Sequence, residues 1–188
     1  MTVRSRLFAF SFGFMSLLPV SSGFLPTQYL PIYGGSGGSG FTRSCGAGKV
    51  LTGFTYRDGL AVDAIGLLCR PVSANGSLGS ESTVGTLAGG GGGTSGSWSC
   101  PSDQVITQVR IAYGTYVNEV LAWCQKWNAS TRSFSGTKTI PLSGAGSYPT
   151  LGGTSRVEEC EAATQPAVGI RGRAHSLVDA LGFICDEP

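Results

Sequence analysis

The chain has 188 residues, of which 30 are glycine and only 13% are charged. This composition favours short strands and tight turns over amphipathic helices. The net charge is +2, and the Lys and Arg residues are scattered along the chain, so the sequence shows no basic patch of the kind that binds nucleic acid or an anionic membrane. We therefore expect neither a nucleic-acid partner nor insertion into a membrane.

Residues 1–23 have the features of a signal peptide. Arg4 and Arg6 precede an apolar run at residues 7–18, which is too short to span a bilayer. Small residues follow, and we place cleavage near Ser22 or Gly23. The sequence thus predicts a secreted protein of one domain, residues 24–188. The alternative is an N-terminal anchor that is not cleaved.

The cysteines indicate an internal repeat, because they occur as three pairs with internal separations of 24, 24 and 25 residues. The repeats span about 30–83, 84–147 and 148–188. Segments 53–69 and 169–185 are identical at seven of 17 aligned positions, and segment 108–124 keeps the same apolar pattern. A glycine pair lies seven or eight residues before the first cysteine of each repeat: Gly37-Gly38, Gly92-Gly93 and Gly152-Gly153.

Each cysteine pair brackets a predicted β-hairpin. Segments 50–56, 105–112 and 167–173 carry β-branched or aromatic residues at alternate positions. Turn residues such as Asp58-Gly59 follow, and a second apolar strand ends in cysteine. Antiparallel strands return both cysteines to the open end of the hairpin, within bridging range. We expect three disulfides: Cys45–Cys69, Cys100–Cys124 and Cys160–Cys185.

The glycine stretches and the closing sequences VDAIGLLC and VDALGFIC resemble the repeats of vitelline membrane outer layer protein I, which is a β-prism. The segment around Asp63 is also similar to the G-x-x-x-D-A-I-G stretch of jacalin-type lectins, which share that fold. These resemblances imply an all-β protein of three four-stranded antiparallel sheets with pseudo-threefold symmetry. A β-trefoil is the alternative, but its Q-x-W motif occurs once, at Gln125-Lys126-Trp127.

The sequence offers little for catalysis. His175 is the sole histidine, and no cysteine is left once the repeats are paired. The one acidic cluster, Glu158, Glu159 and Glu161, fits a solvated strand edge, where side chains alternate between faces. The cysteines lack the close spacing of zinc sites. We therefore expect no catalytic residue, no metal and no cofactor.

The resemblance to jacalin-type lectins implies a sugar pocket built from a G-x-x-x-D loop and a facing glycine-rich loop. Gly59 and Asp63 complete that pattern in the first repeat, and the family topology places them opposite Gly92-Gly93. We expect Asp63 to accept hydrogen bonds from the hydroxyls of a neutral hexose. The alternative is that the aspartate only caps its turn.

The other two repeats keep parts of the pattern. Asp179 retains the carboxylate and would face Gly37-Gly38, but His175 stands where the glycine would be, so we expect weaker binding there. Asn118 replaces the carboxylate in the second repeat and is expected to matter least.

The predicted function is secreted, non-catalytic carbohydrate binding, with a glycan or glycoconjugate as partner. The alternative is a structural protein of an extracellular coat or matrix without a sugar site. Asn75-Gly76-Ser77 and Asn128-Ala129-Ser130 are N-glycosylation acceptors if the host is eukaryotic.

Overall fold

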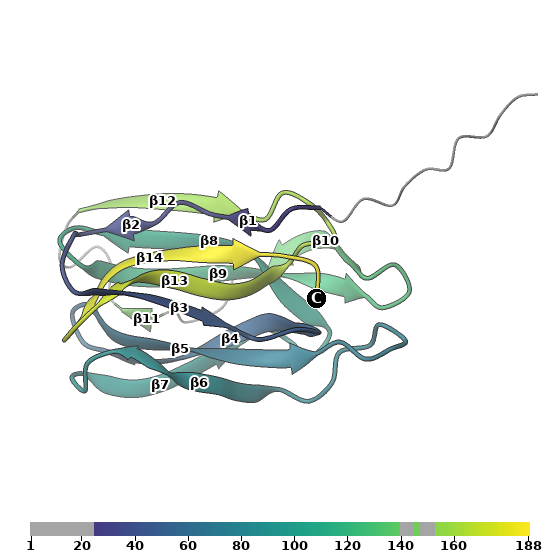
Figure 1. Ribbon diagram of the computed structural model, residues 1–188, viewed down its shortest axis with the longest axis horizontal. Helices are drawn as coiled ribbons and strands as arrows, with labels where there is room; N and C mark the ends of the chain where they lie inside the picture. The colour runs from purple at the N-terminus through teal and green to yellow at the C-terminus, as the bar shows by residue number, and fades with distance from the viewer. Residues whose placement is uncertain (1–24, 140–144, 147–152) are drawn as a thin grey trace, which may run out of the picture.

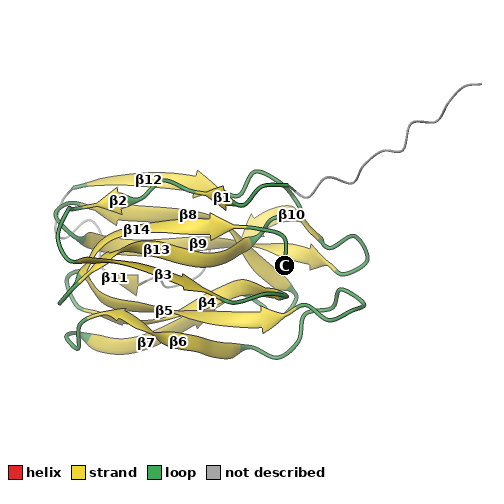
Figure 2. Ribbon diagram, in the orientation of Figure 1, coloured by secondary structure: helices red, strands yellow, loops and turns green. Residues whose placement is uncertain are grey.

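The structure is a computed structural model, which describes residues 25–139, 145–146 and 153–188. These residues form 14 strands, joined by loops and turns (Figure 2). No helix among them is long and apolar enough to cross a membrane. The predicted signal peptide, residues 1–23, lies outside the described residues.

The strands form three antiparallel sheets around one core, and each sheet has a long hairpin at its centre (Figure 1). The strand order is β6-β5-β4-β7 in the first sheet, β10-β9-β8-β12 in the second and β1-β14-β13-β3 in the third. The all-β, three-sheet β-prism expected from the sequence is thereby confirmed. The strands of the first sheet are β4 (Lys49–Asp58), β5 (Val62–Pro71), β6 (Ser82–Gly89) and β7 (Thr94–Ser99).

The second and third sheets each have an outer strand in two pieces, so they hold five strands and not the expected four. β1 and β2 both pair with β14, and Pro31, which has no N–H to donate, lies between them. β10 and β11 both pair with β9. The strands of the second sheet are β8 (Gln104–Tyr113), β9 (Val117–Asn128), β10 (Ser133–Thr139), β11 (Ala145–Gly146) and β12 (Thr154–Glu159); those of the third are β1 (Gln28–Tyr29), β2 (Tyr33–Gly34), β3 (Ser39–Ser44), β13 (Ala167–Ala174) and β14 (Val178–Cys185).

The central hairpins confirm the predicted strands. Segments 50–56, 105–112 and 167–173 fall within β4, β8 and β13, and tight turns lead into β5, β9 and β14. The outer strands, however, do not follow the sequence repeats. β3 lies before the first hairpin in sequence and yet pairs with β13 of the third. Gly92-Gly93 is therefore carried by the sheet of the preceding hairpin, and Gly37-Gly38 by the sheet of the last hairpin.

This arrangement gives the disulfides a second role. Cys45 follows β3, and its N–H donates to the carbonyl of Val168 in the third sheet at 2.9 Å, while its sulfur is bonded to Cys69 in the first sheet. Cys100–Cys124 joins the first sheet to the second in the same way, and Cys160–Cys185 joins the second to the third. The predicted pairs are all present. Each pair lies at the open end of its hairpin, as predicted, and the structure adds that the first cysteine directly follows the outer strand of the neighbouring sheet.

The inner faces of the three sheets meet in one hydrophobic core. Phe183 of β14 is fully buried and packs edge-to-face against Phe54 of β4, with ring centroids 5.8 Å apart. Aliphatic side chains from every central hairpin surround this contact. Among the largest of them are Leu51, Ile65, Leu67, Ile106, Ile111, Ile170 and Leu181.

Replacing Cys100 and Cys124 together with alanine tests the disulfide ring. Closing a loop of about 25 residues contributes roughly 3 kcal/mol to stability. We therefore expect the melting temperature to fall by roughly 6–12 °C, as measured by circular dichroism. Ser97→Ala, at an exposed position of β7, is the control and should change stability by less than about 0.5 kcal/mol. An unchanged melting temperature in the double variant would contradict a stabilising role for this bridge.

Candidate functional site

The three predicted site positions, Asp63, Asn118 and Asp179, occupy one structural position in the three hairpins. In the first hairpin Arg57 pairs with Ala64 and Asp58 pairs with Val62, so Asp63 is the extra residue of a β-bulge directly after the turn. The register is the same at Asn118 and at Asp179. A bulge turns a side chain out of the regular alternation. The fold thus presents these three side chains at the turn end of the prism.

A glycine loop faces the carboxylate in the first and third hairpins. A Cβ added to Gly92 would lie 2.2 Å from Oδ1 of Asp63, and one added to Gly93 would lie 2.5 Å from Oδ2. The corresponding distances from Gly37 and Gly38 to the two oxygens of Asp179 are also 2.2 and 2.5 Å. The structure therefore brings together the residues that the sequence paired. Only glycine leaves room for the loop to approach the carboxylate this closely.

The second hairpin carries a different group. Asn118 is buried, and a Cβ added to Gly153 would lie 3.4 Å from its Nδ2 atom. Gly152 lies outside the described residues. Among the described residues, this copy has an amide where the other two have a carboxylate.

Neighbouring repeats support the glycine loops. The N–H of Gly35 donates to the carbonyl of Asp179 at 2.8 Å, and a Cβ on Gly35 would meet the carbonyl oxygen of Thr115 at 2.2 Å. In the same way, the N–H of Gly90 donates to the carbonyl of Asp63, and a Cβ on Gly90 would meet the carbonyl oxygen of Ser176. These two loops are therefore each seated on the bulge of their own sheet and on the turn of another hairpin.

Tyr33, directly before the first glycine loop, fixes the start of that loop. Its ring stacks on Tyr113 of the second sheet with centroids 5.4 Å apart, and its hydroxyl donates to the carboxylate of Glu158. That hydrogen bond, together with desolvation, raises the pKa of Tyr33 to about 12. The hydrogen bond to Glu158 thus favours the protonated form of the Tyr33 phenol.

A pocket of about 260 Å³ opens beside Asp179. Asp179 is only 6% exposed, and its Oδ2 atom is buried without a hydrogen-bond partner among the described residues. Asp63 is less deeply buried. The pocket is open with His175 in place, so a side chain at that turn position does not fill it. It is lined by Gly38, Tyr116, His175, Ser176, Leu177 and Asp179.

Two arginines at this end of the molecule were not anticipated from the sequence. Arg57 and Arg173 donate hydrogen bonds to the carbonyls of the glycine loops that face Asp63 and Asp179. A signal was present, because both arginines stand six residues before the aspartate and are among the identical positions of the aligned repeats. The glycine carbonyls that they bind could not be identified before the loops were placed.

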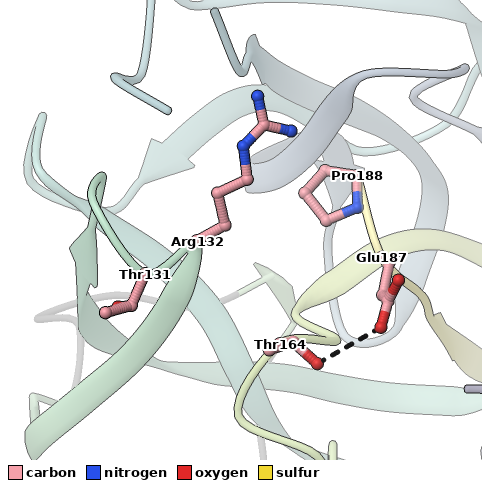
Figure 3. Close-up of a pocket in the computed structure, with 5 residues that line it drawn as sticks. All are labelled: Thr131, Arg132, Thr164, Glu187 and Pro188. Carbon is pink, nitrogen blue, oxygen red and sulfur yellow. Dashed lines mark hydrogen bonds between the residues drawn. The ribbon is translucent and has the colours of Figure 1, made fainter. Parts of the chain in front are cut away.

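A second pocket, of about 280 Å³, lies between the start of β10 and the C-terminus, at the end of the prism opposite the hairpin turns (Figure 1), and its lining residues are drawn in Figure 3. Its polar groups already have partners: Arg132 donates to the carbonyls of Ser73 and Ala74, and Thr164 donates to Glu187 at 3.5 Å. No group of three or more His, Cys, Asp or Glu side chains suited to a metal ion occurs in the described part of the chain. The pocket beside Asp179 is therefore the better candidate site.

Solved structures with a similar fold include several lectins and a lamprey immune protein. A mannose-binding jacalin-related lectin from Ananas comosus matches with a TM-score of 0.60 at 20% identity, covering 86% of this chain and 99% of the lectin. The Malaysian banana lectin matches with a TM-score of 0.58 at 18% identity, and the agglutinin of Calystegia sepium with a TM-score of 0.59 at 16% identity. Both matches cover 88% of this chain and 100% of the other protein. No family model and no curated protein matches the sequence. The similarity therefore establishes the β-prism fold.

The close approach of Gly92 to Asp63 can be tested by adding a methyl group. Gly92→Ala places a Cβ against the carboxylate, and we expect a loss of roughly 1–3 kcal/mol in the free energy of unfolding, as for other overpacked positions. Gly91→Ala is the matched control, because a Cβ there meets nothing within 4 Å. Chemical denaturation of both variants is the measurement. Equal stability of the two would contradict the loop position.

Proposed function

We propose that the protein is a secreted, non-catalytic lectin that binds neutral hexose units of glycans at the turn end of the prism. Two sites are proposed: Asp63 with Gly59 and the loop at Gly92-Gly93, and Asp179 with the loop at Gly37-Gly38. The observation that carries the proposal is the carboxylate of Asp179, which lines an open pocket and has one oxygen, Oδ2, buried without a hydrogen-bond partner among the described residues.

A buried carboxylate oxygen without a donor is costly, and a ligand that donates a hydrogen bond offsets that cost. Sugar hydroxyls are such donors, and because they are neutral, an uncharged ligand can supply the hydrogen bond. The pocket also offers Tyr116, an aromatic ring that is 39% exposed and suited to the apolar face of a sugar. This combination of a carboxylate, close backbone and an exposed ring supports a neutral hexose.

The structural neighbours point to the same ligand class. One is described as mannose binding, and the Calystegia sepium lectin has been solved in complex with a biantennary N-glycan. Mannose and mannose-containing N-glycans are therefore the first ligands to test. Three disulfides support export to an oxidising compartment.

The geometry favours a ranking of the two sites by affinity that is opposite to the ranking expected from the sequence. The sequence ranked Asp63 first because its repeat has both the glycine and the carboxylate. Asp179, however, is the more deeply buried and has the unpartnered oxygen. We propose the Asp179 site as the tighter of the two.

Replacing each aspartate with asparagine tests this proposal. Asn118 holds the same position in the second hairpin, so the amide is compatible with the bulge. A charge-assisted hydrogen bond contributes roughly 1.5–3 kcal/mol, and we therefore expect Asp179→Asn to weaken mannose binding at its site about 10- to 100-fold. Asp63→Asn should remove the weaker site, and the double variant should not bind. Isothermal titration calorimetry gives the affinity and the number of sites.

Asp103→Asn is the matched control, because this carboxylate is 56% exposed and directly precedes β8, at the opposite end of that strand from its hairpin turn. It should bind as the unchanged protein does. If the unchanged protein binds no glycan on an array, the lectin proposal fails and a coat or matrix role is favoured. If both aspartate variants melt several degrees lower and bind unchanged, the aspartates are turn caps.

A further inference from the structure

Two arginines hold the backbone of the glycine loops at the proposed sites. Arg57 of β4 donates from Nε to the carbonyl of Gly92 at 2.6 Å and from Nη2 to that of Gly93 at 2.8 Å. Arg173 of β13 donates to the carbonyls of Gly37 and Gly38 at 2.7 and 2.6 Å. Both guanidinium groups thus bind two successive carbonyls of the loop that faces an aspartate.

These contacts fix peptide planes that glycine would otherwise leave free. A guanidinium group is planar, and its N–H groups form a rigid fork. In a trans peptide the N–H points opposite to the carbonyl, so fixing the carbonyl of Gly37 directs the N–H of Gly38 away from Arg173. Gly38 and Gly93 have φ angles of 59° and 62°, in the region where glycine is favoured. An unrestrained loop of this kind has much conformational entropy to lose when it binds a ligand.

The second hairpin provides an internal comparison. Arg57 pairs with Ala64 and Arg173 pairs with Ala180, and the residue in this register in β8 is Ala112, which pairs with Glu119. The arginine is thus present in the two copies that have an aspartate and is replaced in the copy that has Asn118. Because the second hairpin folds with alanine at this position, the bulge and the turn do not require the arginine.

We infer that Arg57 and Arg173 are positioning residues, which hold the glycine loops in the conformation that binds the sugar. The inference rests on the proposed function. The arginines act through the loop backbone, and each serves the aspartate of its own hairpin. They lower the entropic cost of binding by ordering the loop before the ligand arrives.

The test uses proteins that keep a single site. Arg173→Gln is introduced into the Asp63→Asn variant, which keeps only the Asp179 site. Arg57→Gln is introduced into the Asp179→Asn variant, which keeps only the Asp63 site. We expect mannose affinity to fall about tenfold in each, as when charge-assisted hydrogen bonds are lost. Amide hydrogen exchange of the loop at Gly37-Gly38, or of the loop at Gly92-Gly93, should speed up about tenfold before any ligand is added. Arg173→Lys, which keeps the charge and loses the fork, should recover only part of the affinity.

Arg156→Gln is the matched control in both backgrounds, because the hydrogen bonds of this exposed arginine of β12 go, among the described residues, to Thr154 and Ser155 of its own strand. It should leave affinity and exchange unchanged. If the single-site proteins bind mannose and the glutamine variants bind it equally well with unchanged exchange, the inference is wrong and the proposed function stands. If neither single-site protein nor the unchanged protein binds any glycan, the proposed function fails and the inference fails with it. A fall in affinity that only follows a lower melting temperature would assign the arginines to stability and overturn their positioning role.

Discussion

The fold depends on a ring of covalent links between its three sheets. Each disulfide joins the end of one sheet's outer strand to the central hairpin of the next sheet. The third sheet is linked back to the first, so the ring is closed. The outer strands reach across the repeats in the same sense, since β3 pairs with β13. A chain with 30 glycines has much conformational entropy to lose on folding, and cross-links reduce that loss by restricting the unfolded chain.

This closed frame gives the two ends of the prism different roles. At the turn end, the glycine loops meet the bulges and the turns of other hairpins (Figure 1). At the opposite end, the disulfides and longer connections close the core. Because the turn end is held from several repeats at once, short loops rich in glycine keep defined positions there. A binding site can then be assembled from backbone that would be mobile in an isolated hairpin.

The three copies share one backbone plan and differ in the chemistry placed on it. The bulge after each turn presents Asp63, Asn118 or Asp179, and the register of that bulge does not change. Arginine accompanies the two aspartates, whereas Ala112 accompanies the asparagine. Repetition thus supplies the frame three times, and substitution at two positions per copy decides which copies carry a charged site. Such a division suits a fold whose stability comes from the shared core and cross-links.

The sequence alone determined the repeat, the hairpins and the disulfide pairs, because cysteine spacing and alternating apolar residues are local signals. It also matched Asp63 with Gly92 and Asp179 with Gly37, but through the topology implied by a family resemblance. Only the tertiary structure decided that the bridges run between sheets, that Asp179 is the more buried carboxylate, and that Arg57 and Arg173 hold the loops. Burial, and hydrogen bonds from an arginine side chain to a carbonyl 35 or 136 residues away, depend on how the three sheets close, which no local pattern records.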